Sequence, residues 1–453
     1  MNEQSLACFK AYDIRGKVPT ELNTDLAYKI GRATVEFLHA KKMIVGRDVR
    51  QSGQELCDAL INGMTDSGAD VVDIGLCGTE MVYFATSHLN ADGGIMITAS
   101  HNPPEYNGMK FVREQSKPIS SDTGLNDIER MVIQNTFTKI GSKGSVEKMD
   151  VMQPYIQRLL QTVDLSSLKP LKVVVNAGNG CAGPVIDELE KHMPFQFIKI
   201  HHTPDSSFPH GVPNPLLVEN RPATADAVRE HQADAAIAWD GDFDRCFFFD
   251  EKGDFIEGYY IVGFLAQALL LKNPGAKIIY DVRLTWNTID LVQENGGVPL
   301  VCKSGHAFIK ELMRKEDAIY GGEMSAHHYF KDFFYCDSGM IPWLLVLEIM
   351  SRTGRKLSDL VKERIRKYPV SGEINLRVQD QDGAIARVQK HFESRNPEIN
   401  TVDGVSMEFS DWRCNIRKSN TEPILRVNVE SRQNEQLMQE KTREILQIIE
   451  AGA

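Results

Sequence analysis

Short apolar runs rich in β-branched residues alternate with longer amphipathic stretches from residue 23 to residue 321. This alternation is typical of α/β domains, in which helices follow strands and cover the sheet. Strands are expected in three successive groups, at 43–45, 71–74 and 95–98, at 172–176, 197–200 and 235–239, and at 277–281, 298–301 and 318–321. Helical periodicity is clear at residues 23–38, 182–192 and 258–271.

The length of 453 residues is enough for several domains, and three breaks divide the chain. Segment 139–148 is rich in Gly, Ser and Lys, and turns are expected at 250–254 and 368–372. The remainder is expected to hold strands near 373–378, 405–410 and 424–430 and a closing helix at 433–449. The sequence predicts three related α/β domains with mixed sheets and a smaller C-terminal α+β domain, at 1–146, 147–252, 253–367 and 368–453.

Charge and composition exclude several classes of protein. The net charge of −11 opposes binding to nucleic acid or to anionic lipid unless a local basic patch forms. The eight cysteines include no CxxC pair, which argues against structural zinc and redox motifs. The apolar run 259–271 is too short to span a bilayer, and the first residues show no export signal. We therefore expect a cytoplasmic protein with no membrane and no nucleic-acid partner.

The motif ITASHNPP, residues 97–104, directly follows the third expected strand. Ligands of α/β sheets bind at the carboxyl ends of strands, so Ser100 is presented there rather than buried in a helix or strand. A hydrolase nucleophile elbow is excluded, because no Gly-x-Ser-x-Gly surrounds Ser100. Ser, Asn and Pro also form plain turns, and the motif alone does not separate these two interpretations.

Three aspartates at alternate positions, Asp240, Asp242 and Asp244, close another apolar strand. Carboxylates so close together raise one another's pKa unless a cation joins them, and oxygen ligands favour Mg²⁺ or Ca²⁺. An EF-hand is excluded, because Arg245 stands where that loop requires Gly and both flanks are strand-like. The pattern favours a Mg²⁺ site over a solvated acidic turn, with Arg245 available for a phosphate.

Two further loops carry polar groups, one suited to the hydroxyls of a sugar and the other to an anion. Glu323 and Ser325, two positions apart, can bind vicinal hydroxyls, whereas the adjacent His327 and His328 face opposite ways on an extended segment and are rejected as a metal pair. The segment RKSNTEP, residues 417–423, offers hydroxyl, amide and guanidinium donors for an anion. A polar loop before a strand explains that segment equally well.

A glycine-rich loop supplies a rival class. The pattern G-x-G-x-x-G runs from Gly178 to Gly183 after an expected strand, with Asp205 about 20 residues further on, as in dinucleotide-binding folds. An NAD(P)-dependent oxidoreductase is therefore an alternative. A tight turn between a strand and a helix explains the glycines as well.

Together with FKAYDIRG at residues 9–16, the four ordered motifs resemble the α-D-phosphohexomutase family over nearly the whole chain. The resemblance implies the same four domains, arranged around one central cleft. The GEMSAHH loop is most similar to the bacterial phosphomannomutase type that feeds GDP-mannose synthesis for surface polysaccharide. The implied function is an isomerase that interconverts mannose 6-phosphate and mannose 1-phosphate through a phosphoserine and a 1,6-bisphosphate intermediate. Phosphoglucomutase or dual activity is the alternative within the family.

The resemblance also implies roles for individual residues. The implied catalytic residues are Ser100, His101, Lys110, Arg245 and His306. The implied substrate-binding residues are Tyr12, Arg15, Arg283, Glu323, Ser325, His327, Arg417, Ser419, Asn420 and Thr421. One Mg²⁺ per subunit would be held by Ser100, Asp240, Asp242 and Asp244, with a hexose 1,6-bisphosphate as activator. The implied partner is a small phosphosugar, and the implied assembly is a monomer or homodimer.

Overall fold

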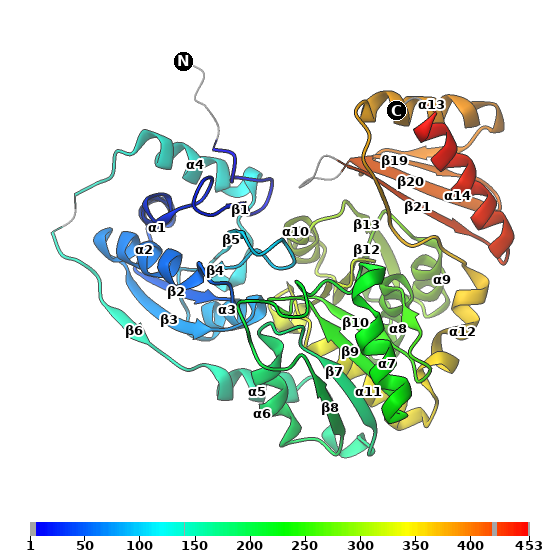
Figure 1. The fold of residues 1–453 in the computed structure, drawn as a ribbon, viewed down its shortest axis with the longest axis horizontal. Helices are drawn as coiled ribbons and strands as arrows, with labels where there is room; N and C mark the ends of the chain where they lie inside the picture. The colour runs from blue at the N-terminus through cyan, green and yellow to red at the C-terminus, as the bar shows by residue number, and fades with distance from the viewer. Residues whose placement is uncertain (1–5, 140, 419–423, 452–453) are drawn as a thin grey trace. The chain divides into compact units, whose positions relative to one another are not determined.

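The computed structural model describes residues 6–139, 141–418 and 424–451. The chain forms two compact units, which are coloured by residue number in Figure 1. Unit 1 comprises residues 1–255 and 327–356, and unit 2 comprises residues 256–326 and 357–453. The chain passes from unit 1 to unit 2 at the short strand β11 (Phe255–Ile256).

The first sheet of unit 1 has the strand order β1-β5-β4-β2-β3-β6. Its parallel centre is formed by β4, β2, β3 and β6, whereas β5 runs antiparallel to both β4 and β1. The strands are β1 (Ile14–Lys17), β2 (Lys42–Arg47), β3 (Asp70–Leu76), β4 (Gly93–Ile97), β5 (Tyr106–Arg113) and β6 (Val146–Lys148). The helices around it are α1 (Thr24–Leu38), α2 (Gly53–Asp66), α3 (Thr79–His88) and α4 (Leu125–Gln134).

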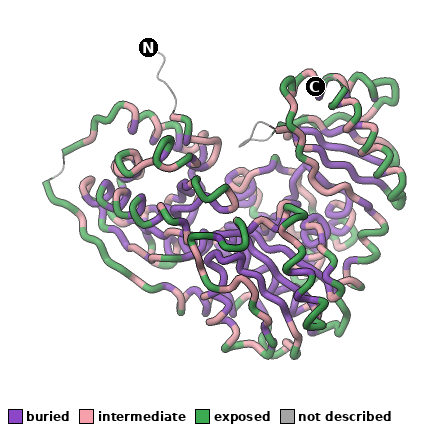
Figure 2. Tube along the Cα trace, viewed as in Figure 1, coloured by how far each residue is buried: buried purple, intermediate pink, exposed green. Residues whose placement is uncertain are grey.

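Both faces of this sheet are covered, because its central strands are apolar at successive positions. Met43 and Val45 of β2 belong to the core shared with α1, α2 and α4, whereas the buried Ile44 points to the opposite face. Figure 2 shows these strands buried and the outer sides of the helices exposed. Such two-sided burial is what a parallel α/β sheet requires.

The second sheet of unit 1 carries the neighbouring strands β10, β9, β7 and β8. β7 is parallel to β8 and β9, and β9 forms an antiparallel hairpin with β10. The strands are β7 (Lys172–Asn176), β8 (Gln196–Ile200), β9 (Ala235–Trp239) and β10 (Cys246–Phe249), and the helices are α5 (Met152–Leu160), α6 (Ala182–Glu190) and α7 (Pro222–His231). Unit 1 also includes β15 (His328–Phe330), β16 (Cys336–Asp337) and α11 (Ile341–Thr353).

Unit 2 begins with another α/β segment. β12 (Lys277–Asp281) pairs in parallel with β13 (Val298–Cys302) and with β14 (Tyr320–Gly322). The helices are α8 (Gly258–Lys272), α9 (Trp286–Glu294), α10 (His306–Glu316) and α12 (Leu357–Lys367). In the described part of the chain, no helix combines the length and the apolar character needed to cross a bilayer.

The C-terminal sheet of unit 2 is antiparallel throughout, in the order β17-β21-β20-β19-β18. Its strands are β17 (Ile374–Leu376), β18 (Glu398–Asn400), β19 (Val405–Glu408), β20 (Trp412–Lys418) and β21 (Leu425–Ser431). Helices α13 (Gln381–Phe392) and α14 (Glu435–Glu450) lie together on this sheet in Figure 1 and complete a separate core. The predicted fold class, α/β domains with mixed sheets followed by an α+β domain, is confirmed.

Candidate active site

The serine loop, residues 98–105, follows β4 in unit 1. Ser100 is buried and has the left-handed backbone conformation, with φ of 49°, which non-glycine residues rarely adopt. Its Oγ donates a hydrogen bond of 2.7 Å to Oδ2 of Asp240 and lies 3.0 Å from Nδ1 of His101. The hydroxyl is therefore held against the first of the three predicted metal ligands.

The aspartate loop, residues 240–245, joins the antiparallel strands β9 and β10. This hairpin confirms the exclusion of an EF-hand, which requires helical flanks. Asp240, Asp242 and Asp244 are all buried, and each offers a carboxylate oxygen within 4.8 Å of the others. The turn thus brings the three charges together, as their alternate spacing predicted.

Two cationic side chains offset this concentration of negative charge. Nζ of Lys110, on β5, donates 2.7 Å to Oδ2 of Asp242 and also bonds Asp244. Nε of Arg245 donates 2.8 Å to Oδ2 of Asp240. Burial alone would lower the pKa of Lys110, but Asp242 and Asp244 outweigh it and raise that pKa. The ammonium therefore stays charged at neutral pH.

The carboxylates themselves shift in opposite directions. Burial, together with Asp244 and Asp242, raises the pKa of Asp240 against the opposing effect of Arg245. Burial also acts to raise the pKa of Asp244, but Lys110 and His327 outweigh it and hold the pKa well below its usual range. The pair behaves as expected for like charges that share a buried site.

His101 is neutral in this environment. Burial lowers its pKa, and the nearby cations Arg245 and Arg15 lower it further. Nη2 of Arg245 lies 2.5 Å from Nδ1 of His101, and because a guanidinium can only donate, Nδ1 is the acceptor. The imidazole proton therefore sits on Nε2.

The aspartate loop receives support from α3, which the sequence did not reveal. Oγ1 of Thr79, the first residue of α3, donates 2.5 Å to Oδ2 of Asp242, and its backbone N–H donates 3.0 Å to the Asp242 carbonyl. Gly78 leaves room for the Phe243 ring, which a side chain at that position would meet. Nothing in the sequence pairs residues 78 and 79 with a loop more than 160 positions away.

The donor set fits a divalent cation with oxygen ligands. Oδ1 of Asp242 is buried and accepts no hydrogen bond, which leaves one carboxylate oxygen available. Asp240, Asp242, Asp244 and the Ser100 hydroxyl supply hard oxygen donors of the kind that Mg²⁺ prefers. A cation there would take over part of the neutralisation that Lys110 now provides.

Three other predicted residues of unit 1 lie around these loops. Nη1 of Arg15, on β1, donates 2.5 Å to Oδ1 of Asn102 in the serine loop, and Tyr12 lies near enough to influence the pKa of Arg15. Nε2 of His327 lies 3.6 Å from Oδ1 of Asp244, and the His327 backbone bridges that of Arg245. The structure thus places His327 beside the aspartate loop.

The glycine-rich loop packs against the same site. A Cβ at Gly180 would lie 2.6 Å from the carbonyl oxygen of Gly241, and the N–H of Cys181 donates 3.0 Å to that oxygen. A Cβ at Gly241 would in turn lie 2.8 Å from the carbonyl oxygen of Ser100. The glycines therefore serve the close approach of two loops, and this geometry gives no support to the alternative of a dinucleotide-binding loop.

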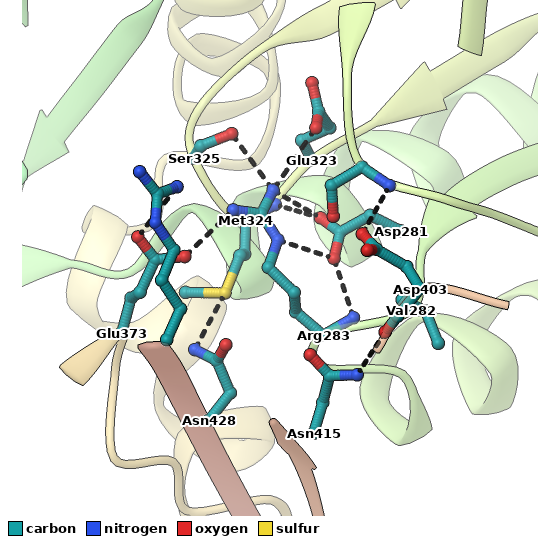
Figure 3. Close-up of polar contacts among 12 residues, drawn as sticks. Asp281, Val282, Arg283, Glu323, Met324, Ser325, Glu373, Asp403, Asn415 and Asn428 are labelled. Carbon is teal, nitrogen blue, oxygen red and sulfur yellow. Dashed lines mark hydrogen bonds and ion pairs between the residues drawn. The ribbon is translucent and has the colours of Figure 1, made fainter. Parts of the chain in front are cut away.

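Unit 2 holds the other predicted residues that the structure describes, of which Figure 3 labels Arg283, Glu323 and Ser325. The guanidinium of Arg283 is buried and bonds the Asp281 carboxylate through Nε at 2.9 Å and Nη2 at 3.0 Å. Its Nη2 also reaches Oε1 of Glu323 at 3.3 Å and Oγ of Ser325 at 3.1 Å. The predicted sugar-binding pair is therefore ordered by one arginine.

Glu323 and His306 are linked through one loop. The N–H of Gly305 donates 3.1 Å to Oε1 of Glu323. This bond links the residue that follows β14 to the residue that precedes α10. His306 begins α10, and its Nδ1 lies 3.4 Å from Nζ of Lys310. The predicted catalytic histidine of this unit thus lies next to the loop of Glu323 and Ser325, which is predicted to bind the sugar.

A carboxylate that the sequence did not single out, Glu373, joins the three arginines of what we call the arginine cluster: Arg283, Arg417 and Arg426. Its Oε2 lies 3.2 Å from Nη1 of Arg283 and 3.5 Å from Nη2 of Arg417, and its Oε1 lies 3.4 Å from Nη1 of Arg426. Burial alone would raise the pKa of Glu373, but the three cations lower it. The predicted residues Ser419, Asn420 and Thr421 lie outside the described residues.

Family models for four domains match the chain in order. They are described as phosphoglucomutase/phosphomannomutase α/β/α domains I, II and III and the C-terminal domain, at residues 7–139, 153–253, 257–368 and 373–447. The chain therefore belongs to the phosphoglucomutase/phosphomannomutase family, which confirms the resemblance.

Individual relatives match over almost the full length. A phosphomannomutase of Escherichia coli is 58% identical over 452 residues, which is 98% of this chain and 99% of the relative. A protein of Xanthomonas campestris named "Phosphohexose mutases" is 57% identical over 445 residues, again 98% and 99%. The crystal structure of a phosphoglucomutase/phosphomannomutase family protein from Burkholderia thailandensis has a TM-score of 0.88 at 33% identity and covers 99% of both chains. These similarities give no support to the oxidoreductase alternative.

Proposed function

We propose that this chain is a phosphomannomutase that interconverts mannose 6-phosphate and mannose 1-phosphate. The observation that carries the proposal is the Ser100 hydroxyl, buried and 2.7 Å from Asp240 at the edge of the three-aspartate loop. Full-length relatives named phosphomannomutase, 53–58% identical, support this substrate over other hexose phosphates. The four family segments support the domain limits predicted from the sequence.

In the proposed reaction, Ser100 carries a phosphoryl group between turnovers. The bond from phosphorus to Oγ breaks as a bond to O1 of mannose 6-phosphate forms, which gives mannose 1,6-bisphosphate. The proton that leaves O1 balances the one that Oγ gains, and the unprotonated Nδ1 of His101, 3.0 Å from Oγ, is in position to accept that proton again when Ser100 is rephosphorylated. The reverse transfer from O6 to Oγ then releases mannose 1-phosphate.

Charge compensation is the main requirement of phosphoryl transfer. Mg²⁺ held by Asp240, Asp242, Asp244 and an oxygen on Ser100 would neutralise charge on the transferring group when bound. Arg245 and Lys110 stand beside the same carboxylates and would bind phosphoryl oxygens. We propose a hexose 1,6-bisphosphate as the activator that first phosphorylates Ser100.

Substrate binding is proposed for the remaining predicted residues. In unit 1, Tyr12, Arg15 and His327 would contact the substrate. In unit 2, Glu323 and Ser325 would bind O3 and O4 of the sugar. Arg283 and Arg417, together with residues 419–421, would bind the phosphate that is not transferred. His306 would assist proton transfer. Because mannose and glucose differ only at C2, contacts to O3 and O4 discriminate weakly, and we expect measurable phosphoglucomutase activity.

The cytoplasmic location and the monomeric or homodimeric state remain predictions.

The test combines intact-mass analysis with a coupled assay of mannose 1-phosphate, glucose 1-phosphate and glucosamine 1-phosphate, with and without Mg²⁺ and hexose 1,6-bisphosphate. We expect one added phosphoryl group that maps to Ser100, and mannose 1-phosphate as the preferred substrate. Ser100→Ala should lower kcat by at least about 1,000-fold with substrate binding nearly unchanged. Ser142→Ala, at an exposed serine, is the matched control. A phosphoryl group on another residue, or full activity of Ser100→Ala, would contradict the proposal.

A further inference from the structure

Two buried charged residues outside the site described above lie directly beneath the serine loop. Asp48 and Arg50 follow β2 in the segment GRDVR, residues 46–50, and their side chains are only 1% exposed. Buried charges of this kind are costly unless they are paired and fully hydrogen-bonded. The groups that hydrogen-bond to Asp48 and Arg50 therefore indicate the role of the pair.

The Arg50 guanidinium donates to four backbone carbonyl oxygens of one short stretch. Nη2 donates 2.9 Å to Ser100 and 2.6 Å to Asn102, and Nη1 donates 2.8 Å to both Pro103 and Tyr106. Residues 99–105 form no helix or strand, so the carbonyls of Ser100, Asn102 and Pro103 have no regular ladder to satisfy them, and Tyr106 begins β5. A planar guanidinium with donors in a fixed fork can order several such groups at once, which an ammonium cannot do.

Asp48 is linked to the backbone N–H of Ser100 through Thr98. Its Oδ1 accepts the backbone N–H of Arg50 at 3.0 Å, and its Oδ2 accepts the Thr98 hydroxyl at 2.6 Å. Oγ1 of Thr98 in turn accepts the backbone N–H of Ser100 at 2.8 Å. The N–H of Ser100 is thus held through Asp48 and Thr98, and its carbonyl is held by Arg50.

We propose that Asp48 and Arg50 are positioning residues for the phosphoryl carrier: they hold the Ser100 backbone in the left-handed conformation that directs Oγ toward Asp240. This inference rests on the proposed function, since it assigns a catalytic purpose to the orientation of Ser100. The left-handed conformation is disfavoured for serine, so surrounding bonds must maintain it. A misplacement of the order of 1 Å at a reacting atom can lower a rate by about 100-fold.

The test compares Arg50→Lys with Arg47→Lys. The Arg47 guanidinium donates to Oε1 of Gln54 through Nε at 2.9 Å and Nη2 at 2.6 Å, and Arg47→Lys serves as the matched control. Arg50→Lys keeps the positive charge but cannot reach four carbonyls. We expect kcat to fall about 10- to 100-fold with KM within about threefold of wild type. Hydrogen exchange should become faster at residues 100–106, and Arg47→Lys should change neither quantity.

A second pair of variants keeps the inference falsifiable if Arg50→Lys folds poorly. Thr98→Val removes the hydroxyl that links Asp48 to the Ser100 N–H while it keeps the shape, and Thr98→Ser retains the hydroxyl. We expect Thr98→Val to lower kcat at least about tenfold and Thr98→Ser to stay within about threefold of wild type. Unchanged kcat in both Arg50→Lys and Thr98→Val, or losses that only follow the folded fraction, would overturn the inference.

The proposed function is judged separately by the wild-type protein. Absence of a phosphoryl group on Ser100 and of mutase activity in the wild type would overturn the function and, with it, the catalytic purpose assigned to the pair. Activity in the wild type with normal turnover in the variants would overturn the positioning inference alone.

Discussion

At the scale of single residues, the site is organised by charge neutralisation. Asp240, Asp242 and Asp244 are buried together, and without a metal the charges that face them are those of Lys110 and Arg245. The hydroxyl of Thr79 adds a short bond to Asp242. Lys110 and Arg245, which neutralise the carboxylates in the folded protein, are also the cations that we propose to bind phosphoryl oxygens.

Asp242→Asn removes one of these charges with little change of size. We expect Mg²⁺-dependent activity to fall at least about 100-fold, because a proposed metal ligand loses its charge. The thermal midpoint should stay within about 3 °C of wild type, since relief of repulsion offsets the weaker bonds to Lys110 and Thr79. Kinetics as a function of Mg²⁺ concentration, with calorimetry, measure both effects.

The matched control is Asp254→Asn, which removes an exposed carboxylate from the next turn of the chain. Its Mg²⁺ dependence should equal that of the wild type. Near-normal turnover of Asp242→Asn at saturating Mg²⁺ would contradict the assignment of the metal site.

At the scale of elements, a buried glutamate connects three helices of unit 1. Glu80, in the first turn of α3, accepts bonds from the Tyr155 hydroxyl of α5 at 2.6 Å and from the Ser338 hydroxyl before α11 at 2.9 Å. It also accepts the backbone N–H groups of Gly339 and Met340. Since Thr79 next to it bonds Asp242, this junction fixes the helix end that supports the aspartate loop.

Burial raises the pKa of Glu80 from 4.5 to about 8, against the opposing effect of these hydrogen bonds. Between these two values the folded protein holds a proton that the unfolded chain has released. Stability from this group is therefore complete below pH 4.5 and is lost as the pH rises toward 8. The loss is at most about 1.4 kcal/mol per pH unit.

Glu80→Gln should flatten this dependence, because an amide does not titrate. Thermal midpoints measured from pH 5.5 to 8.5 in wild type, Glu80→Gln and the exposed control Glu230→Gln test this expectation. The slopes of wild type and of Glu230→Gln should agree. An equal slope in Glu80→Gln would show that Glu80 does not titrate in this range.

At the scale of the whole molecule, a chain with a net charge of −11 must concentrate its cations locally to bind phosphosugars. Unit 2 concentrates cations in the arginine cluster, which is contributed by the segment after β12 and by two paired strands, β20 and β21. Glu373 acts as its internal counter-ion. Burial and the neighbouring Arg283 lower the pKa of Arg417, although Glu373 opposes them.

We expect Arg417→Ala to weaken substrate binding, because a charge-assisted contact to phosphate contributes about 1.5–3 kcal/mol. KM should rise about 10- to 100-fold while kcat changes by less than about fivefold. Glu373 keeps Arg283 and Arg426, so the loss of stability should be small. The control for steady-state kinetics is Arg387→Ala. The Arg387 guanidinium, on α13, donates to the Ile449 carbonyl of α14. A lower kcat at unchanged KM would contradict a binding role.

Local patterns in the sequence were enough to predict most elements. Strands β7, β9 and β12 coincide with predicted segments. A strand that is buried on both faces is a continuous apolar run, and this pattern can be recognised without knowing which segments pack against it. Strand β20 was missed for the opposite reason. Its alternate residues Arg413, Asn415 and Arg417 are buried and polar, and Arg413 bonds the Val282 and Arg283 carbonyls of unit 2.

The sequence by itself determined the α/β plan, the serine at a strand end and the three aspartates on one turn, because each depends only on neighbours along the chain. Only the tertiary structure decided that Ser100 lies on Asp240, that Thr79 and Lys110 hold the aspartate loop, and that Glu373 joins the arginine cluster. It also decided that residues 327–356 belong to unit 1 and that the glycine-rich loop packs closely against Gly241. These arrangements depend on how separate cores pack, and contacts between distant segments leave no periodicity in the sequence.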